Sequence, residues 1–363
     1  MLLTSYNIFT LEDWSCTSKM KVFEFDSVEE SYSEIIKYVL EHGDEVSPRG
    51  QLTKEITPAT IVINNPRKRM ISHPDRKLNY GFMVGELLWI LQGKNDLSIT
   101  HYNKQWANFS DDGQILNGAY GQRIFNWDGG EAFIENNHNE NDIPMFEVQD
   151  IRINQFMQVY NRLKDDPESR QGTISLFDPS KDFAKTKDVP CTNWMRFTIR
   201  NGKLNMLVGM RSNDLWFGYP YDVYNFTMLQ EIMAGLLDVE VGKYTHIADS
   251  LHLYEMHFEA AKKMINNQHQ NIYDEKTLVD ARLDIDNLDK TIDKVFTIEH
   301  ITRENGEYIK VEDVLAKIED VENEYWKSLA AVIATYNFKK AKREIEEIEE
   351  LRKLITNEFN GIL

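Results

Sequence analysis

The chain has 363 residues and a formal net charge of −18, from 41 Lys and Arg against 59 Asp and Glu; it is long enough for a large core in one or two domains, and its charge would repel nucleic acid. No run of about 18 apolar residues occurs, and residues 1–15 carry acidic rather than basic side chains beside a short apolar stretch, so we expect neither a membrane span nor a signal peptide. Two cysteines, Cys16 and Cys191, cannot form a disulfide framework and indicate a reducing cytoplasm.

The first two thirds of the chain mix strand and helix patterns. Alternation over residues 20–26 predicts a strand, and a helix is predicted from about residue 31 to residue 41. Residues 81–91 and 226–237 are apolar on all sides, which predicts buried helices. Around Asn201-Gly202, two short apolar runs predict a hairpin with a type I′ turn.

Two segments stand apart from this mixed pattern. Residues 123–145 are rich in Asn, Glu and Gly without an apolar period, which predicts an inserted loop. From about residue 266 onward, apolar residues recur every three to four positions and predict amphipathic helices. The residues of this pattern are Val311, Leu315, Ile318, Val321, Tyr325, Leu329, Val332, Tyr336, Ile345, Ile348, Leu351, Ile355 and Phe359. A helical cap packed on the core is the favoured interpretation, and a separate partner-binding module is the alternative.

A group of chemically active side chains lies between residues 189 and 254. Cys191 follows Pro190, and within about sixty residues come a cation, hydroxyls, carboxylates and a histidine, each bracketed by apolar strand or helix material. These residues are Arg211, Ser212, Asp214, Asp222, His252 and Tyr254. Their spacing indicates an active site.

These segments resemble the thymidylate synthase superfamily, which also contains the deoxycytidylate hydroxymethylases. Segments farther upstream agree in the family's order: residues 38–43 before Arg49, then 85–93, 118–121 and 166–170. The resemblance covers about residues 32–262. It implies an α/β fold with a large mixed sheet flanked by helices, and a homodimer formed through that sheet. We therefore divide the chain into an N-terminal extension (1–31), a catalytic domain (32–265) and a helical C-terminal extension (266–363).

Cys191 is the candidate nucleophile. C5 of a pyrimidine is a poor nucleophile, and addition of a thiolate at C6 makes C5 enamine-like. A nearby Arg211 would lower the pKa of the thiol. The alternative is a small buried hydrophobic residue, which is the expectation for Cys16.

The resemblance assigns the nucleotide phosphate to Arg49, Arg211 and Ser212, with Arg170 reaching across from the other subunit. An arginine fork suits phosphate oxygens better than a lysine does. Gln171 stands where synthases have a second arginine, so one contact across the dimer is missing from the pattern. Taken singly, each arginine has the alternative of an ordinary surface cation.

Glu86 lies in an apolar helical run, where an unpaired carboxylate is costly to bury. By resemblance it organises water and proton transfer near C4 and C5, and burial should raise its pKa; an ion-paired or snorkelling glutamate is the alternative. Trp89 on the same helix belongs to the core or to a wall of the folate site. Tyr120 resembles the tyrosine that orders water near the base.

Asp222 bears on the choice of base. Synthases carry asparagine there, which matches the N3–H and O4 of uracil, whereas a carboxyl group sharing a proton with N3 matches cytosine. A carboxylate facing O4 would be unpaired at a cost of about 1–3 kcal/mol. Asp222 therefore favours a cytosine nucleotide over drift in a uracil enzyme.

Further positions complete the predicted site. Asp214 resembles the aspartate that binds the pterin, or else is a turn residue, and His252 and Tyr254 resemble the pair that contacts the sugar hydroxyl, or else are core groups. Thr192 or Asn193 takes the place of the histidine that follows the nucleophile in synthases. These three further roles come from the resemblance alone.

The fate of the one-carbon unit depends on the loop before Trp106. Aligning Trp106 with the second of two synthase tryptophans places Asn103 at the first, a residue that shields the exocyclic methylene in synthases. A polar Asn103 there would admit water.

The sequence thus predicts hydroxymethylation of dCMP, or of CMP, with 5,10-methylenetetrahydrofolate as co-substrate and without a metal, membrane or nucleic acid. One alternative is a thymidylate synthase that methylates dUMP. The other is an inactive nucleotide-binding or regulatory protein that interacts through its helical tail.

Overall fold

The computed structural model describes residues 21–136, 145–267, 269, 271–273, 278–356 and 358–359. Cys16 and the rest of residues 1–20 lie outside these ranges. Among the described residues, no helix is both long and apolar enough to cross a membrane.

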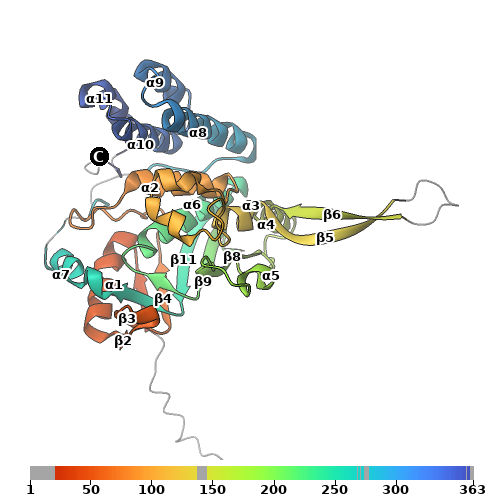
Figure 1. The fold of residues 1–363 in the computed structure, drawn as a ribbon, viewed down its shortest axis with the longest axis horizontal. Helices are drawn as coiled ribbons and strands as arrows, with labels where there is room; N and C mark the ends of the chain where they lie inside the picture. Colours follow the sequence, from red (N-terminus) through yellow and green to blue (C-terminus); the bar gives the residue numbers. More distant parts are fainter. Residues whose placement is uncertain are drawn as a thin grey trace, which may run out of the picture.

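A mixed six-stranded sheet forms the centre of the molecule, as the predicted α/β fold requires (Figure 1). The strand order is β1 (Lys21–Phe25), β4 (Ala59–Ile63), β11 (Glu240–Ala248), β9 (Lys203–Met210), β8 (Thr192–Arg200) and β7 (Thr173–Ser175). The turn between β8 and β9 has φ of 54° at Asn201 and 71° at Gly202. Positive φ at both positions is what a type I′ turn needs, so the predicted hairpin is confirmed.

A second, four-stranded sheet arranges the predicted site segments beside one another. Its order is β10 (Asn213–Asp214), β12 (Leu251–Tyr254), β3 (Thr53–Ile56) and β2 (Asp44–Val46). Asp214 pairs with His252 across β10 and β12, and Tyr254 pairs with Thr53 at the start of β3. The short 3₁₀ turn η2 (Pro48–Gly50), which carries Arg49, precedes β3. Three distant parts of the sequence therefore meet at one sheet.

Helix α1 (Val28–His42) begins earlier than the sequence pattern predicted. The side chain of Ser27 accepts a hydrogen bond from the backbone N–H of Glu30 at 3.1 Å and caps the helix. The Glu30 carboxylate in turn accepts from the N–H of Asp26. Such reciprocal capping satisfies backbone donors that a helix start leaves unpaired, so the helix begins three residues before residue 31.

The two helices predicted to be buried form a layer above the sheet. Helix α6 (Tyr219–Leu236) packs on β9 and β11, and α2 (Tyr80–Leu91) packs on α6. Residues 80–90 are all buried, because α2 is covered from the other side as well, by α10 (Glu324–Lys340). A helix that is covered on both sides has no solvent-facing side, so its sequence is apolar all round.

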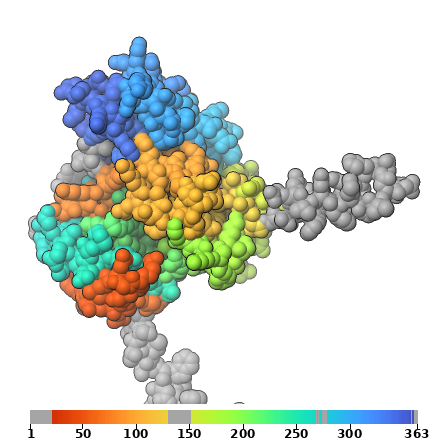
Figure 2. Space-filling view, viewed as in Figure 1, coloured from red at the N-terminus to blue at the C-terminus, as the bar shows by residue number. Residues whose placement is uncertain are grey.

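The described residues of the C-terminal part include four helices, which Figures 1 and 2 show over α2. They are α8 (Ile285–Asn305), α9 (Val311–Glu319), α10 and α11 (Ile345–Lys353). Tyr102 donates to the carboxylate of Glu299 on α8 at 2.6 Å, and His101 lies 3.0 Å from Oδ1 of Asn337 on α10. The helices therefore pack on the core as a cap. The proposed boundaries at residues 31 and 265 stay a prediction.

Helix α10 differs from the amphipathic helix that its sequence pattern predicted. Twelve of its residues are buried, including polar Ser328, Thr335 and Asn337. Two of these polar side chains find partners inside the cap: Ser328 accepts from the N–H of Thr356 at 2.8 Å, and Asn337 donates to Thr302 at 3.0 Å. The simple apolar period did not reveal that α10 lies between α2, α8 and α11.

The predicted loop over residues 123–145 is wrong. Trp127–Asn136 (β5) and Met145–Ile153 (β6) pair as an antiparallel hairpin, which Figure 1 shows projecting from the body of the molecule. A two-stranded ribbon is held by backbone pairing and needs no buried face, so its sequence need not show an apolar alternation. Residues 137–144, in the same predicted loop, lie outside the described residues.

Shorter elements connect these layers. They are α3 (Tyr120–Phe125), α4 (Gln155–Asp165), α5 (Pro179–Asp182), α7 (Phe258–Asn266), η3 (Leu97–His101), η4 (Lys104–Phe109) and η5 (Glu255–His257). Arg123, at the end of α3, is fully buried and donates to Asp182 of α5 at 2.9 Å. This buried pair fixes α3, which carries Tyr120, to the loop that leads toward Cys191.

Replacing Gly81 by alanine tests the packing of α10 on α2. A Cβ at Gly81 would overlap the ring of Tyr336. Alanine normally stabilises a helix relative to glycine by up to about 1 kcal/mol, but here overpacking should lower the free energy of unfolding by about 1–3 kcal/mol. Denaturant unfolding of Gly81→Ala, Tyr336→Ala and the double variant measures this. Additive effects of the two changes would contradict the contact.

Candidate active site

Cys191 and Arg211 are brought together by the pairing of β8 with β9. The backbone N–H of Arg211 donates to the carbonyl of Cys191 at 2.9 Å. The guanidinium turns back and donates to the carbonyls of Pro190 at 3.1 Å and Val189 at 2.9 Å, and Nη2 lies 3.6 Å from the Cys191 sulfur. Two carbonyl acceptors thus hold this cation beside a half-buried free thiol.

Arg211 lowers the pKa of the thiol, as predicted, but burial outweighs this effect. Burial raises the pKa of Cys191 above its ordinary value, and the positive charges of Arg211 and Arg49 offset only part of this effect. The negative charges of Asp222 and Asp188 add to the rise. The sequence analysis marked Arg211 and Asp222 as site residues but did not mark Asp188.

Two buried carboxyl groups interact with each other, one on each buried helix, and one of them, Asp222, also acts on the thiol. Burial, followed by the charge of Asp222, raises the pKa of Glu86 on α2 to about 8, as the sequence predicted in direction. Burial raises the pKa of Asp222, in the first turn of α6, to about 7. A helix N-terminus favours a negative charge, so burial is the stronger effect at Asp222. Both groups are able to hold a proton near neutral pH.

Each carboxyl accepts a hydrogen bond from one buried asparagine. Asn213 donates to Oδ2 of Asp222 at 2.8 Å, and Asn225 donates to Oε2 of Glu86 at 2.8 Å. Sequence reasoning missed both asparagines as site residues. A clue in the sequence existed only for Asn213, which lies between the predicted site residues Ser212 and Asp214. Nothing in the sequence pattern marked Asn225.

Tyr120 joins the same group from α3. Its hydroxyl accepts hydrogen bonds from the backbone N–H of Thr192 at 3.2 Å and from the Thr192 side chain at 3.0 Å. Burial, then the charges of Asp222 and Cys191, raise the pKa of Tyr120 well above its ordinary value. Of the two residues expected to replace the missing histidine, Thr192 is the one that contacts Tyr120, while the backbone of Asn193 pairs with Leu176.

Asp214, His252 and Tyr254 lie together on the second sheet. Oδ1 of Asp214 accepts from the N–H of Trp216 at 2.8 Å, so the residue also shapes a turn. Burial raises the pKa of Asp214, opposed by the Trp216 N–H and His252. The rings of His252 and Tyr254 meet edge to face with centroids 5.1 Å apart. Ser212 is half-buried between β9 and β10.

The predicted phosphate-binding arginines are not all in one place. Arg49 is exposed, and its charge acts on Cys191. Arg170 lies elsewhere: the carbonyl of the nearby Gly172 accepts from the N–H of Phe197. Phe197 is six residues along β8 from Cys191, or about 20 Å at the rise of a strand. Arg170 therefore does not join the site of its own chain.

The residues beside α2 form an aromatic wall. The Trp89 indole is buried, donates to the carbonyl of Asp96 at 3.2 Å and meets Trp106 with ring centroids 6.0 Å apart. Asn103 is half-buried, and its side chain caps η4 by accepting from the N–H of Gln105 at 3.1 Å. Asn103 thus lies at the start of the turn that carries Trp106.

Arg76 is a buried cation that the sequence analysis did not mark, and it contacts the turn that follows Asp214. Arg76 donates to the hydroxyl of Tyr32 at 2.9 Å and to the carbonyl of Trp216, and its guanidinium lies 4.6 Å from the centroid of the Trp216 ring. The ring of His257 stacks beside Trp216 at 5.3 Å. This arrangement fixes the turn that follows Asp214.

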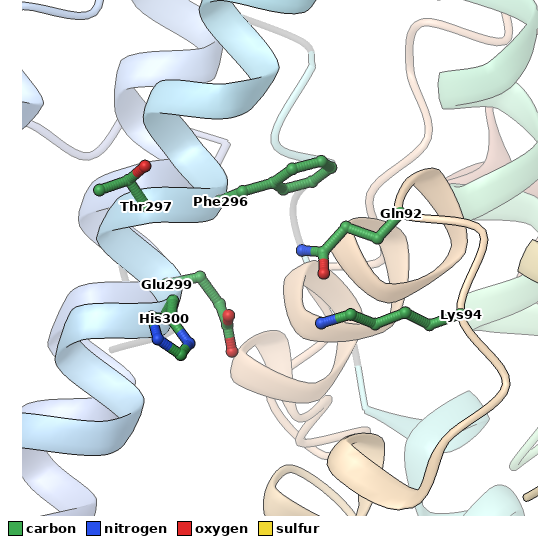
Figure 3. A pocket seen from close by; sticks show the side chains of 6 residues that line it. All are labelled: Gln92, Lys94, Phe296, Thr297, Glu299 and His300. Atoms are coloured by element: carbon green, nitrogen blue, oxygen red, sulfur yellow. The ribbon is translucent and has the colours of Figure 1, made fainter.

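A cavity of about 270 Å³ lies between the end of α2 and α8 (Figure 3). It is lined by Gln92, Lys94, Phe296, Thr297, Glu299 and His300. None of these is a predicted site residue, so the cavity is separate from the group around Cys191. In the part of the chain that the structure describes, no cluster of His, Cys, Asp and Glu could hold a metal ion.

A half-buried thiol, an arginine held beside it and two carboxyls whose pKa burial raises thus lie on this mixed α/β fold. The thymidylate synthase family model matches residues 30–313. The chain is 33% identical over 308 residues to the deoxyuridylate hydroxymethyltransferase of Bacillus phage SP01, covering 82% of this chain and 76% of that protein. It is 29% identical over 241 residues to the protein of the same name from Pseudomonas phage M6, covering 65% of this chain and 62% of that protein.

The chain belongs to the thymidylate synthase family. Enzymes of this family use methylenetetrahydrofolate as the co-substrate. The resemblance and the mixed α/β fold predicted from the sequence are thereby confirmed.

Replacing Arg211 tests its effect on the thiol. In a Cys16→Ser background, Arg211→Gln should raise the pKa of Cys191 further, because it removes the positive charge that opposes burial. The rate of iodoacetamide alkylation, followed against pH, measures this and should fall several-fold at pH 8. Arg211→Lys keeps the charge and should show a smaller change. Identical alkylation profiles for all three proteins would contradict the electrostatic role.

Proposed function

We propose that this chain transfers a hydroxymethyl group to C5 of a pyrimidine deoxynucleoside 5′-monophosphate. The observation that carries the proposal is the grouping of the Cys191 thiol, the Arg211 guanidinium and two protonatable carboxyls, Glu86 and Asp222. The names of the two phage relatives support hydroxymethyl over methyl transfer.

In the proposed reaction Cys191 attacks C6 of the base as a thiolate. Because burial raises the thiol pKa in the free protein, deprotonation is a step that the bound substrate must promote. Arg211 lies next to the sulfur and stabilises the anion when it forms. Glu86, with a pKa of about 8, holds a proton at neutral pH and serves as the acid and base for the pyrimidine ring.

The residues near Asp214 fit the folate that the family requires. Asp214 is half-buried on β10, and a carboxyl is able to accept from both an amide and an amine of a pterin. Next to it, the ring of Phe217 is 49% exposed and stacks edge-on to His257. When bound, methylenetetrahydrofolate supplies the one-carbon unit. Asp214 and the wall of Trp89 and Trp106 would hold it.

The loop at Asn103 supports water as the final nucleophile. Asn103 provides a half-buried polar side chain directly before the turn of Trp106. A synthase at this point excludes water so that hydride reaches the methylene. We infer that the amide of Asn103 instead holds water near it.

The base is proposed to be uracil, and the pKa of Asp222 is the reason. At a pKa of about 7 the group is a neutral acid in much of the protein at neutral pH, with one O–H donor and one carbonyl acceptor. A neutral acid offers O4 a donor and N3–H an acceptor, as asparagine does. The unpaired carboxylate that argued against uracil therefore does not arise. The names of both relatives favour the same base.

dCMP remains the second candidate substrate, because a carboxyl group is also able to match cytosine. The acid O–H then faces N3 and the carbonyl faces the N4 amine. Asp222 itself favours this candidate, since asparagine is the synthase residue at this point.

One turnover experiment tests both the reaction and the base. We expect the wild type to convert dUMP and methylenetetrahydrofolate to 5-hydroxymethyl-dUMP, identified by product mass, with a lower kcat/KM for dCMP. Cys191→Ala should abolish turnover and the release of tritium from C5 while still binding the nucleotide. A greater kcat/KM for dCMP would select the second candidate. Formation of dTMP and dihydrofolate would establish a thymidylate synthase, and no tritium release by the wild type would indicate an inactive binding protein.

The ionisation of Asp222 predicts a pH effect on nucleotide binding. Its pKa is raised to about 7, so the donor for O4 is present below that pH and is lost as the pH rises through it. In the Cys191→Ala background, dUMP should bind more weakly from pH 7 to pH 9, and Asp222→Asn should remove this decline. Calorimetry measures the affinity. A decline that persists in Asp222→Asn would assign it to another group, such as Glu86.

We also propose that the active enzyme is a homodimer with shared sites. Arg170 lies two residues before Gly172, which bonds to Phe197 at a point about 20 Å along β8 from Cys191 of the same chain, so its phosphate contact requires a neighbour. Neither Cys191→Ala nor Arg170→Ala alone should be active, but their mixture should regain activity in the heterodimer, where one site keeps both residues. A mixture that stays inactive after proven subunit exchange would contradict shared sites.

A further inference from the structure

The two asparagines of the site stand in matching arrangements. Asn213 and Asn225 are each 2% exposed, and each donates its amide N–H to one carboxyl oxygen at 2.8 Å. In the described part of the chain, the amide oxygen of each has no hydrogen-bond partner. Within the described ranges, each buried side chain therefore makes a single hydrogen bond: Asn213 with Asp222, and Asn225 with Glu86.

The amide of Asn213 is held firmly in place. Its backbone N–H donates to the carbonyl of Ser250 at 2.8 Å, which ties β10 to the start of β12. Gly218 packs closely against the side chains of both Asn213 and Asp222. A Cβ on Gly218 would lie 2.9 Å from Nδ2 of Asn213 and 3.2 Å from Oδ2 of Asp222. The contact between the Asn213 and Asp222 side chains therefore requires glycine, which has no Cβ, at position 218.

A neutral carboxyl group by itself does not choose between uracil and cytosine. It carries one donor and one acceptor, and the proton is able to sit on either oxygen. Uracil needs an acceptor opposite N3 and a donor opposite O4, and cytosine needs the reverse. For one position of the ring, the choice of base is therefore the choice of which oxygen holds the proton.

We propose that Asn213 determines the base specificity of this enzyme by fixing Oδ2 of Asp222 as the acceptor and leaving the proton to Oδ1. This inference rests on the proposed function, in which Asp222 reads the base. Asn213 acts as a positioning residue, because its contact is with Asp222. With the hydrogen bond from Asn213, one oxygen of Asp222 is always the acceptor and the other always the donor. This order matches the polar groups of one base, whereas the other base would leave donors or acceptors without a partner.

The same bond influences the ionisation of Asp222. The N–H of Asn213 favours the charged carboxylate and opposes burial, while Asp214 on β10 disfavours it. The charge of Asp222 is also felt by other groups around it: Glu86 on α2, Tyr120 on α3, Cys191 before β8 and Tyr244 on β11. Loss of the Asn213 bond leaves these groups in place, so the neutral form of Asp222 should persist to higher pH.

The test compares kcat/KM for dUMP and dCMP between pH 6.5 and pH 9 in the full-length enzyme. Asn213→Leu removes the hydrogen-bond donor but keeps a side chain of similar size. It should bring the ratio of kcat/KM for dUMP and dCMP about tenfold closer to one, because about one hydrogen bond to an ionisable group is lost. The decline of dUMP binding should move to higher pH. Gly218→Ala keeps the donor but presses on both atoms, and it should reduce the preference in the same direction.

Asn225→Leu is the matched control, since it removes the equivalent bond to Glu86. It should lower kcat and leave the ratio between the bases unchanged. An unchanged ratio in both Asn213→Leu and Gly218→Ala, with folding verified by circular dichroism, would overturn the inference. Failure of the proposed function is seen separately, because the wild type would then lack turnover, or Asp222→Asn would leave the base ratio unaffected.

Discussion

The burial of a thiol and two carboxyl groups, Cys191, Asp222 and Glu86, is the constraint on which this site depends. Burial is the largest influence on the pKa of Glu86, Asp222 and Cys191, and it raises all three. Single amide donors from Asn213 and Asn225 offset part of the effect for the two acids. The free protein therefore keeps protons on these groups near neutral pH, which avoids burying several negative charges together. In the reaction that we propose, these protons move when the nucleotide binds.

That burial comes from how the helices are stacked. Helix α6 supplies Asp222 and Asn225, α2 supplies Glu86, and Cys191 lies directly before β8, where the charge of Asp222 acts on it. The outer face of α2 is covered by α10, whose Tyr336 fits against Gly81, while Tyr102 fits against Gly85. The C-terminal helices thus contribute to the site indirectly. Without them the apolar outer face of the helix that carries Glu86 would meet solvent.

Charge is distributed so that an acidic protein is able to bind an anion. The chain carries a net charge of −18, yet Arg211 is fixed beside Cys191 by two backbone carbonyls, and Arg49 stands at an exposed turn whose charge acts on the same thiol. These fixed cations act at short range, where solvent screens them least. The remote position of Arg170 fits the shared-site dimer that we propose.

The sequence by itself determined the elements whose signals are local. The type I′ turn at Asn201-Gly202 requires positive φ, the all-apolar run of α2 requires burial, and the motifs around Cys191 identified the family. Tertiary structure decided whatever depends on distant neighbours. The hairpin over residues 127–153 has no apolar period because its backbone pairing needs none, and α10 is enclosed because other helices surround it. The thiol pKa rises because burial outweighs the charge of Arg211, and because Asp222, from a distant helix, acts on the same thiol. Asn213 and Asn225 gain meaning only from the carboxyls they hold. Electrostatics and burial sum over all neighbours in space, whereas a sequence pattern records only neighbours along the chain.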